Sequence, residues 1–266
     1  MPGQLSAWTR DIVDVLQQSP GPQQLTSMAE WLQRLSGVDH FVLFVYEDAD
    51  RPQPLFDTFA GGLRQLFVDE YQIGPYLQDP FYLASRQSQT GAMSSMRQLA
   101  PDRFYVSEYF RTYYHHLGLC EEVGFFVNMG AQVKAVLSLM RRRSSGAYHS
   151  DDIQLMSDAI PVVDAVVRAA WSAHLHAVRR NDEIRAEFEN FGQGVLTARE
   201  CEIARLLLQG YSNISLSEQL GISPGTVKVH RKHIYDKLGI GSQSELLALF
   251  IRERHPRMPS SRRRPE

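Results

Sequence analysis

The sequence predicts a chain of two domains, an α+β sandwich in front and an all-α bundle of four helices behind it. The chain has 266 residues, more than one minimal domain needs, and hydrophobic residues make up 43% of it, enough for globular cores. Before Ser150, apolar β-branched and aromatic runs alternate with helical spacing. From Leu196 onward only helical spacing appears, interrupted at short intervals by capping residues and glycines.

The front domain is expected to begin with two amphipathic helices at 4–18 and 23–35, separated by the sequence Ser-Pro-Gly-Pro. The continuous apolar run at 40–46 predicts a buried strand. Helices, strands, helices and paired strands in this order favour a sandwich on a mostly antiparallel sheet. Further strands are expected at 54–59, 122–129 and 133–142, and further helices at 62–72, 76–87 and 104–117.

A long helix should start at Ser150 and continue to about Phe191, with Pro161 as a kink or break. Its second half is highly charged, which suits an exposed linker helix, and Gly192 and Gly194 end it. The end of the chain, rich in Arg, Pro and Ser, predicts a disordered basic tail. The expected divisions are a front domain at 1–175, a linker helix at 176–194, an all-α domain at 195–256 and the tail at 257–266.

Composition excludes several classes of protein. No apolar run reaches the roughly 18 residues that a membrane-spanning helix needs. The start of the chain lacks the basic stretch followed by an apolar one that marks a secretion signal. Cys120 and Cys201 lie far apart in the sequence and fit neither a disulfide framework nor a metal site. We therefore expect a cytoplasmic protein that uses no membrane, metal or cofactor.

The formal net charge of −2 hides an asymmetry along the chain. From Gly192 to the end there are 12 Lys and Arg against 7 Asp and Glu, and the residues before it carry 16 against 23. A basic end on an acidic body is typical of a chain in which one domain binds nucleic acid. A solvated surface with a basic tail would give the same totals, so charge alone does not distinguish it from a nucleic-acid-binding domain. The order of residues is needed to choose between the two.

The last domain opens with a capping box. Thr197 stands three residues before Glu200, ahead of an apolar-periodic helix that should stop near Gly210. A short second helix is expected at 212–220, and Gly221 supplies the turn that follows it. These closely spaced signals predict helices joined by tight turns.

The third helix is expected from Ser223 to Lys237, because Ser223 followed by Pro224 pairs an N-cap with a proline at the first helical position. At 100° per residue, Val227 and Ile234 fall on one side, where they would pack against the first two helices.

The opposite side of this helix carries Val229 and Lys232, flanked by Lys228 and Thr226. A helix that is buried along one stripe and basic near its start can insert into the major groove of DNA. There the lysines can donate to guanine, and Val229 or the Thr226 methyl can touch a thymine methyl. The hydroxyls of Ser223 and Thr226 can hold a phosphate. The alternative is a solvated helix face.

The fourth helix repeats the capping box with Ser242 and Glu245 and then presents a run of apolar residues at 246–251. This surface is larger than a three-helix core requires. It predicts either a dimer contact or the completion of a four-helix core.

The segments LTARE, LGIS, TVKVH and KLG, together with Gly210, belong to one continuous run of more than 50 residues. This run resembles the LuxR-type (GerE-like) helix-turn-helix. The resemblance implies that Lys228, Val229 and Lys232 approach bases, and that residues near Thr226 and Arg231 contact the DNA backbone. The chain departs from the family at Leu216-Ser217, where an Ile-Ala pair is usual, although Ser217 remains small.

The front domain is not expected to be a phosphorylated receiver domain, because it opens with two helices and lacks an alternating βα pattern. The segment FVDEYQIGPYLQDP at 67–80 instead resembles the aromatic-x-x-x-Tyr…Tyr…Asp-Pro segment of the autoinducer-binding, GAF-like domain of quorum-sensing LuxR proteins. The segments at 124–130 and 135–139 resemble the paired late strands of that domain.

This second resemblance implies a ligand chamber lined by Phe67, Tyr71, Tyr76 and Phe125, with Asp79 accepting a hydrogen bond from a ligand amide. A Trp usual at the Phe67 position is absent and the Tyr-to-Asp spacing is one residue short, which argues against a homoserine lactone. Such a cavity suits a small, partly apolar ligand bearing an N–H or amine. The alternative is that the aromatic residues form ordinary core and Asp79 caps the following helix.

Two further clusters are expected to be structural. The run Arg141-Arg142-Arg143 at the end of a strand is interpreted as a solvated loop rather than a phosphate site. The pair His115-His116 lacks a third ligand at metal spacing and is interpreted as helix surface.

The sequence therefore predicts a transcription regulator that binds double-stranded DNA as a homodimer on two half-sites, controlled by a small-molecule effector in a ligand-sensing and dimerisation domain at the front. The alternative is a ligand-independent regulator whose front domain serves only dimerisation or protein contact. RNA polymerase is a further candidate partner, and the protein should associate with the nucleoid when it is on DNA. No nucleophile–base set or phosphate loop is present in the sequence, so no enzymatic activity is expected.

Overall fold

The computed structural model describes residues 2–47, 51–87, 92–115, 118–130 and 132–254. The chain divides into two compact units, Met1–His176 and Ala177–Glu266, and each unit is considered by itself. Helix α7 (Ser150–Asn190) spans the division, so its first part belongs to the front unit and its last part to the second unit.

A five-stranded sheet forms the centre of the front unit. Its strands are β1 (His40–Tyr46), β2 (Gln53–Asp57), β3 (Met93–Ser95), β4 (Leu119–Asn128) and β5 (Lys134–Arg142). They lie in the order β2-β1-β5-β4-β3, and all four neighbouring pairs are antiparallel. The antiparallel sheet expected from the sequence is confirmed, with β5 in its middle.

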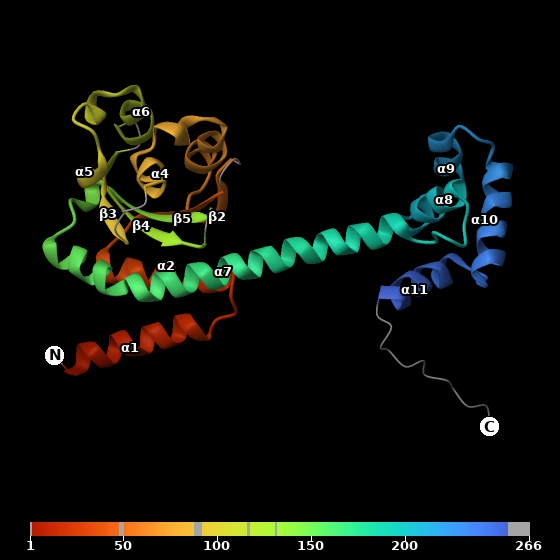
Figure 1. Ribbon diagram of the computed structural model, residues 1–266, viewed down its shortest axis with the longest axis horizontal. Helices are drawn as coiled ribbons and strands as arrows, with labels where there is room; N and C mark the ends of the chain where they lie inside the picture. Colours follow the sequence, from red (N-terminus) through yellow and green to blue (C-terminus); the bar gives the residue numbers. More distant parts are fainter. Residues whose placement is uncertain (1, 48–50, 88–91, 116–117, 131, 255–266) are drawn as a thin grey trace. The chain divides into compact units, whose positions relative to one another are not determined.

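Long helices cover one face of this sheet (Figure 1). They are α1 (Pro2–Gln17), α2 (Pro22–Ser36) and the first part of α7. Trp31 of α2 packs with Leu43, Leu137 and Val163 in the core beneath them, and Trp8 of α1 adds its ring at 5.9 Å from the Trp31 ring. We call this side of the sheet the helical face.

Short, irregular helices cover the opposite side, which we call the aromatic face (Figure 1). Its buried residues include nine aromatic side chains: Phe44, Tyr46, Phe59, Phe67, Tyr71, Phe81, Phe104, Tyr109 and Tyr114. The covering segments are α3 (Gly62–Arg64), a π-helix (Gln65–Glu70), 3-10 turns (Tyr71–Ile73, Pro75–Gln78 and Phe104–Val106), α4 (Pro80–Ser85), α5 (Met96–Leu99), α6 (Glu108–Phe110) and a second π-helix (Arg111–His115).

Two of the helices expected over this face are divided in the structure. The helix expected at 76–87 breaks at Asp79, because the residue before Pro80 is held in an extended conformation (φ −73°, ψ 120°). The helix expected at 104–117 breaks at Ser107, whose hydroxyl accepts a hydrogen bond from the first turn of α6.

Other expectations in the front unit are corrected as well. The helix expected at 62–72 is α-helical only at its start and then becomes a π-helix and a 3-10 turn that ends at Gly74. The strand and helix at 93–99 were not predicted, since three strand residues are too short to show alternation. Pro161 does not end α7, which continues from Ser150 to Asn190.

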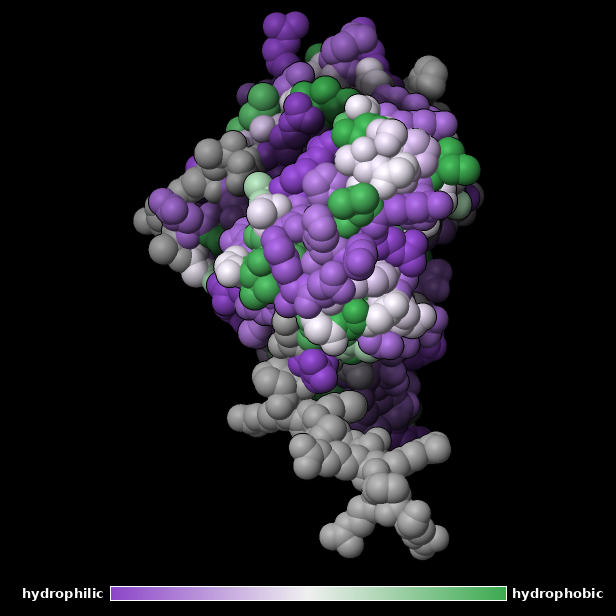
Figure 2. Space-filling model, turned by 90° about the vertical axis from the view of Figure 1, so that its right-hand side faces the viewer, coloured by the Kyte–Doolittle hydropathy of each residue, from purple (hydrophilic) through white to green (hydrophobic). Residues whose placement is uncertain are grey.

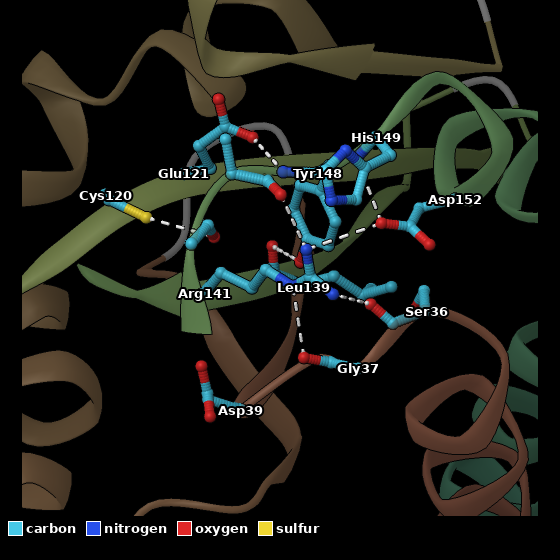
Figure 3. A network of polar contacts seen from close by, with 12 residues as sticks. Ser36, Gly37, Asp39, Cys120, Glu121, Leu139, Arg141, Tyr148, His149 and Asp152 are labelled. Atoms are coloured by element: carbon cyan, nitrogen blue, oxygen red, sulfur yellow. Dashed lines mark hydrogen bonds and ion pairs between the residues drawn. The ribbon is translucent and has the colours of Figure 1, made fainter. Parts of the chain in front are cut away.

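The Arg141 side chain is buried, so the interpretation of this residue as part of a solvated loop is wrong (Figure 3). Its guanidinium donates to the backbone carbonyl oxygens of Ser36, Gly37 and Ala147 at 2.7, 3.1 and 2.8 Å. It also pairs with the Asp152 carboxylate at 3.4 Å. Arg141 therefore joins the end of α2, β5 and the first turn of α7, whereas the next two arginines are exposed.

The second unit contains four further helices, as expected. They are α8 (Ala198–Leu208), α9 (Asn213–Leu220), α10 (Pro224–Leu238) and α11 (Gln243–Arg254). Leu246 of α11 is buried in their core, whereas Leu247 and Ile251 are exposed. Phe191, just after α7, is buried in the same core, so part of the expected linker packs with these helices. The tail expected at 257–266 lies outside the described residues.

Candidate nucleic-acid interface and ligand site

Helix α10 is delimited by local signals that fix where its side chains point. The Ser223 hydroxyl caps the start, accepting a hydrogen bond from the backbone N–H of Thr226 at 3.0 Å, and Pro224 follows at the first helical position. Gly221 ends α9 with a φ of 64° and so allows the tight turn between the two helices.

The two sides of α10 differ in burial in the way that the sequence predicted. Val227 and Ile234 are fully buried against α8 and α9. Lys228, Lys232 and Val229 are exposed, and Val229 keeps 53% of its surface in solvent. An exposed apolar residue between two exposed lysines matches the hydrogen-bond acceptors and the thymine methyl groups that base edges offer in the major groove.

An ion pair inside the second unit holds α10 against α8. Lys237 Nζ lies 2.6 Å from the Glu200 carboxylate, which also accepts the capping-box hydrogen bond from the Thr197 backbone N–H at 2.8 Å. These contacts, with that of Lys237 the strongest, lower the pKa of Glu200 to about 2. The buried Glu200 carboxylate thus caps the start of α8 and also binds Lys237 of α10.

Arg231, expected at the DNA backbone, is half-buried within the protein. It donates to the Tyr235 hydroxyl at 2.9 Å and to the Asn213 side chain at 3.4 Å. Together with Lys228 and Lys232 it borders a hollow of about 350 Å³ between α9 and α10. The structure therefore brings all three basic residues of the predicted set to one side of α10.

The surface on the side of the second unit is mostly hydrophilic (Figure 2). Hydrophobic residues occur there singly or in small groups rather than as one broad patch (Figure 2). A polar surface of this kind suits contact with the charged and hydrated DNA backbone. Ser223 and Thr226, the predicted phosphate contacts, are both exposed at the start of α10.

In the front unit, four of the predicted ligand residues come together on the aromatic face. The Tyr71 hydroxyl donates to the Asp79 carboxylate at 2.6 Å, and the Tyr46 hydroxyl lies 3.0 Å from that of Tyr71. Because the single Tyr71 proton goes to Asp79, Tyr46 is the donor in the second bond. The rings of Phe67 and Tyr76 belong to the same cluster.

Asp79 faces the aromatic cluster and also caps α4, so its capping role is confirmed and its contact with a ligand amide stays a prediction. Its second carboxylate oxygen accepts from the Phe81 backbone N–H at 2.8 Å. Only 7% of its surface is exposed, and this burial raises its pKa to about 6, although the bond from Tyr71 acts in the opposite direction.

Phe125 is not brought together with the other predicted ligand residues. It packs on the helical face with α2 and α7, whereas Phe126 packs on the aromatic face. Gly124 also faces the aromatic side, where a Cβ atom would lie 2.5 Å from the Phe81 ring. The assignment of Phe125 to the ligand chamber, which the family resemblance implied, is therefore wrong by one residue. Neighbouring residues in a strand point to opposite faces of the sheet, so Phe125 points away from the aromatic face.

Glu122 of β4 is a buried acid on the aromatic face and is not among the ligand residues predicted from the sequence. Only 2% of its surface is exposed, and the Tyr114 hydroxyl donates to its carboxylate. Burial raises the pKa of Glu122 to about 8, and the nearby Asp79 charge adds to this effect. The sequence signal was a pair of glutamates, Glu121 and Glu122, at the start of a mostly apolar strand, and it did not show which of them is buried.

A pocket of about 180 Å³ adjoins Glu122, and we call it the edge pocket. Residues from β4, the segments that cover the aromatic face and the start of α7 surround it. They include Tyr105, Phe110, Tyr114, Glu121, Glu122 and Tyr148.

The remaining expectations concern metals and membranes. Within the described residues, no group of three His, Cys, Asp or Glu side chains is arranged to hold a metal ion. Of the His115-His116 pair, His116 lies outside the described residues. No helix in the described parts of the chain combines the length and apolar character needed to cross a membrane.

Comparison with known proteins agrees with this architecture. The family described as "Bacterial regulatory proteins, luxR family" matches residues 194–250. A protein of Aeromonas salmonicida, named as an HTH-type transcriptional regulator in the exeN 3′ region, is 30% identical over 183 residues, which cover 65% of this chain and 93% of that protein. The monoamine regulon transcriptional regulator of Klebsiella aerogenes is 28% identical over 199 residues, covering 73% of this chain and 75% of the relative.

Among solved structures, the VqsR LBD domain from Pseudomonas aeruginosa shares the fold, with a TM-score of 0.55 and 24% identity. The match covers 62% of this chain and 96% of that domain. The relatives are transcription regulators rather than enzymes. By its helix-turn-helix and by its similarity over nearly the whole Aeromonas relative, the chain belongs to the luxR family of bacterial regulatory proteins and is a DNA-binding transcription regulator.

Proposed function

We propose that this regulator reads an operator as a homodimer and that a small molecule bound in the front unit controls it. The observation that carries the proposal is the edge pocket, a hollow at the edge of the sheet beside the buried carboxyl of Glu122, lined by side chains from both the aromatic and the helical face. Ligand sites typically combine apolar walls with a few placed polar groups in this way.

On DNA, α10 would lie in the major groove with Lys228, Val229 and Lys232 toward the base edges. Ser223 and Thr226 would contact a phosphate through their hydroxyls at the start of the helix. Arg231, which Asn213 and Tyr235 hold in place, would contact the backbone from the hollow beside α10.

Dimer formation would use apolar side chains that the second unit leaves exposed on α11. Leu247 and Ile251 each keep 48% of their surface in solvent, although Leu246 on the same helix is fully buried. A dimer of this module would bind half-sites about 10 base pairs, or one turn of DNA, apart.

A route from the edge pocket to α7 supports ligand control. Glu121, in the pocket wall, accepts a hydrogen bond from the Tyr148 backbone N–H at 2.7 Å. The Tyr148 ring lies 4.6 Å from the Arg141 guanidinium, which pairs with Asp152 in the first turn of α7 (Figure 3). A ligand that shifted this wall would act on a helix that belongs to both units.

One observation favours the ligand-independent alternative. The Asp79 carboxyl, which the family resemblance assigns to a ligand amide, already accepts hydrogen bonds from Tyr71 and the Phe81 backbone. A front unit that satisfies its own polar groups could serve only as a dimerisation or protein-contact module.

The test is a thermal melt of the purified full-length protein with and without small-molecule extract from its host, followed by operator binding under the same conditions. A ligand that binds only the folded state raises the melting temperature. We expect a rise in the melting temperature and at least a fivefold change in operator affinity. Full operator binding by the pure protein, with no change in melting temperature for any extract fraction, would support the ligand-independent alternative.

A further inference from the structure

The edge pocket lies where β3 stops covering β4. The last residue of β3, Ser95, pairs with Val123, so Cys120, Glu121 and Glu122 extend beyond it. The pocket occupies this place, and its walls bring Glu122 together with aromatic rings from the segments above β4.

Among the described residues, Glu122 has no charged partner that would stabilise its ionised form. In the described structure, its partners are the hydroxyls of Tyr114 and Ser138, and neither carries a charge. A glutamine could accept the same hydrogen bonds but never ionises, whereas Glu122 can supply a negative charge when a cation binds beside it. A carboxyl in a pocket wall without a cationic partner therefore points to a partner that comes from outside the chain.

A second buried carboxyl strengthens this requirement. Asp79 lies on the same aromatic face, and its charge disfavours ionisation of Glu122. Asp79 is itself bonded by Tyr71 and a backbone amide rather than by a Lys or Arg among the described residues. A positive charge beside these acids would favour the ionised form of both.

The size and walls of the pocket limit what could bring that charge. A cavity of roughly 150 Å³ can hold benzene, so a pocket of about 180 Å³ has room for one ring with a short substituent. The rings of Phe110 and Tyr114 lie parallel, with their centres 5.7 Å apart, and Tyr105 lines the same pocket. Aromatic faces attract ammonium groups as well as ring carbons.

We propose that the edge pocket is the effector site and selects a small one-ring compound carrying a protonated amine, with the Glu122 carboxylate receiving the ammonium group. This inference rests on the proposed ligand control and adds the chemical class of the ligand. It also moves the centre of recognition from Tyr71 and Asp79 to Tyr114 and Glu122.

Three probes of one shape and different charge test the inference on the full-length wild-type protein. They are 2-phenylethylamine, 2-phenylethanol and phenylacetate, measured by calorimetry and by thermal melts at pH 8.5. We expect the amine to bind at least tenfold more tightly than the alcohol and phenylacetate not to bind. An alcohol that binds as tightly as the amine would overturn the amine assignment.

The pH dependence of the wild-type protein gives a second test that needs no variant. The amine stays protonated to about pH 10, as a lysine side chain does, whereas Glu122 must lose its proton to receive it. Affinity for 2-phenylethylamine should therefore rise at least tenfold from pH 6 to pH 8.5, and a flat profile contradicts the proposal.

The other titratable groups around Glu122 do not reverse the expected rise of amine affinity with pH. Burial raises the pKa of Tyr114, Tyr148 and Cys120, so these groups stay neutral over most of the range. Arg97 and Glu121 at the rim form an ion pair at 2.5 Å. Asp79, with a pKa raised to about 6, also becomes negatively charged as pH rises, which favours binding of the amine as ionisation of Glu122 does.

Glu122→Gln keeps the shape of the side chain and removes its charge, and the exposed Glu30→Gln on α2 is the matched control. The first variant should lose at least tenfold in affinity for the amine while its affinity for the alcohol stays within about twofold. The control should bind both probes as the wild type does. Amine binding by Glu122→Gln at wild-type strength refutes the assignment of Glu122.

The outcomes separate this inference from the proposed function. If the alcohol, phenylacetate or host extract raises the melting temperature and the amine does not, ligand control stands and the amine assignment fails. If no probe and no extract fraction changes the melting temperature, and the pure protein binds its operator in full, both fail.

Discussion

Lys228 and Lys232 on α10 stand in solvent, whereas Asp79 and Glu122 on the aromatic face are buried among tyrosine rings. Neither lysine forms a hydrogen bond or ion pair with another residue in the described parts of the chain, so their charge is available to DNA. The two acids form hydrogen bonds with Tyr71 and Tyr114, so any ligand must compete with or join contacts that already stabilise the front unit. Changes on α10 should therefore alter binding alone, and changes on the aromatic face should alter binding and stability together.

The largest expected effect is a pH dependence of stability that is specific to the front unit. Burial raises the pKa of Asp79 to about 6 and of Glu122 to about 8, above the values that these groups have in an unfolded chain. The folded state therefore holds protons that the unfolded state releases, and stability falls as pH rises through these values. We expect the front unit to lose on the order of 3–5 kcal/mol between pH 5 and pH 9.

Tryptophan fluorescence can follow this change, because all three tryptophans, Trp8, Trp31 and Trp171, lie in the front unit. The midpoint of urea unfolding should fall from pH 5 to pH 9 when followed by this signal. Glu122→Gln should remove most of the dependence, and a midpoint that rises with pH would contradict the burial of these acids.

A core substitution in α10 should have the next largest effect, on the second unit alone. Ile234 is fully buried, and Ile234→Ala removes its contacts with α8 and α9 at a cost of about 2–4 kcal/mol. On heating, the variant should lose operator binding and the circular dichroism signal of the second unit's helices at a lower temperature than the wild type does. The tryptophan transition should stay unchanged, and a shift of that transition would show that the units do not unfold separately.

The same contrast explains what could be predicted from the sequence. The helices of the second unit begin and end at local signals such as the Thr197 capping box, the Ser223 cap and Gly221, so their bounds and the exposed side of α10 follow from neighbouring residues. The family resemblance then supplied the roles of the exposed side chains.

The candidate site in the front unit depends on contacts between distant segments, and the prediction was weaker there. β4 is covered on both sides, so its apolar run could not show that Phe125 faces the helices while Glu122 faces the aromatic cluster. The burial of Arg141 depends on carbonyl groups about a hundred positions away in the sequence, at Ser36 and Gly37. No local pattern carries such information.

Removal of one base-facing lysine should weaken operator binding without changing the stability of either unit. Lys228→Ala or Lys232→Ala is expected to cost roughly 1–3 kcal/mol for the operator and much less for unrelated DNA. Fluorescence anisotropy with labelled duplexes at several salt concentrations measures both affinities. Arg103→Ala, an equal change of charge at an exposed site in the front unit, is the control. Equal losses on operator and unrelated DNA would identify the lysine as a phosphate contact instead.

The ion pair between Glu200 and Lys237 should give the smallest effect, with a pH dependence opposite to that of the front unit. The pKa of Glu200 is lowered to about 2 in the folded state, so its stabilising contribution is complete above the unfolded value and is lost as pH falls toward 2. Because Lys237 is partly exposed, Lys237→Met should cost only about 1 kcal/mol at neutral pH. Acid titrations followed by circular dichroism should show a weaker loss of stability between pH 4.5 and pH 2 in this variant than in the wild type. An unchanged acid profile would mean that the Thr197 capping bonds, rather than the lysine, hold the Glu200 carboxylate ionised.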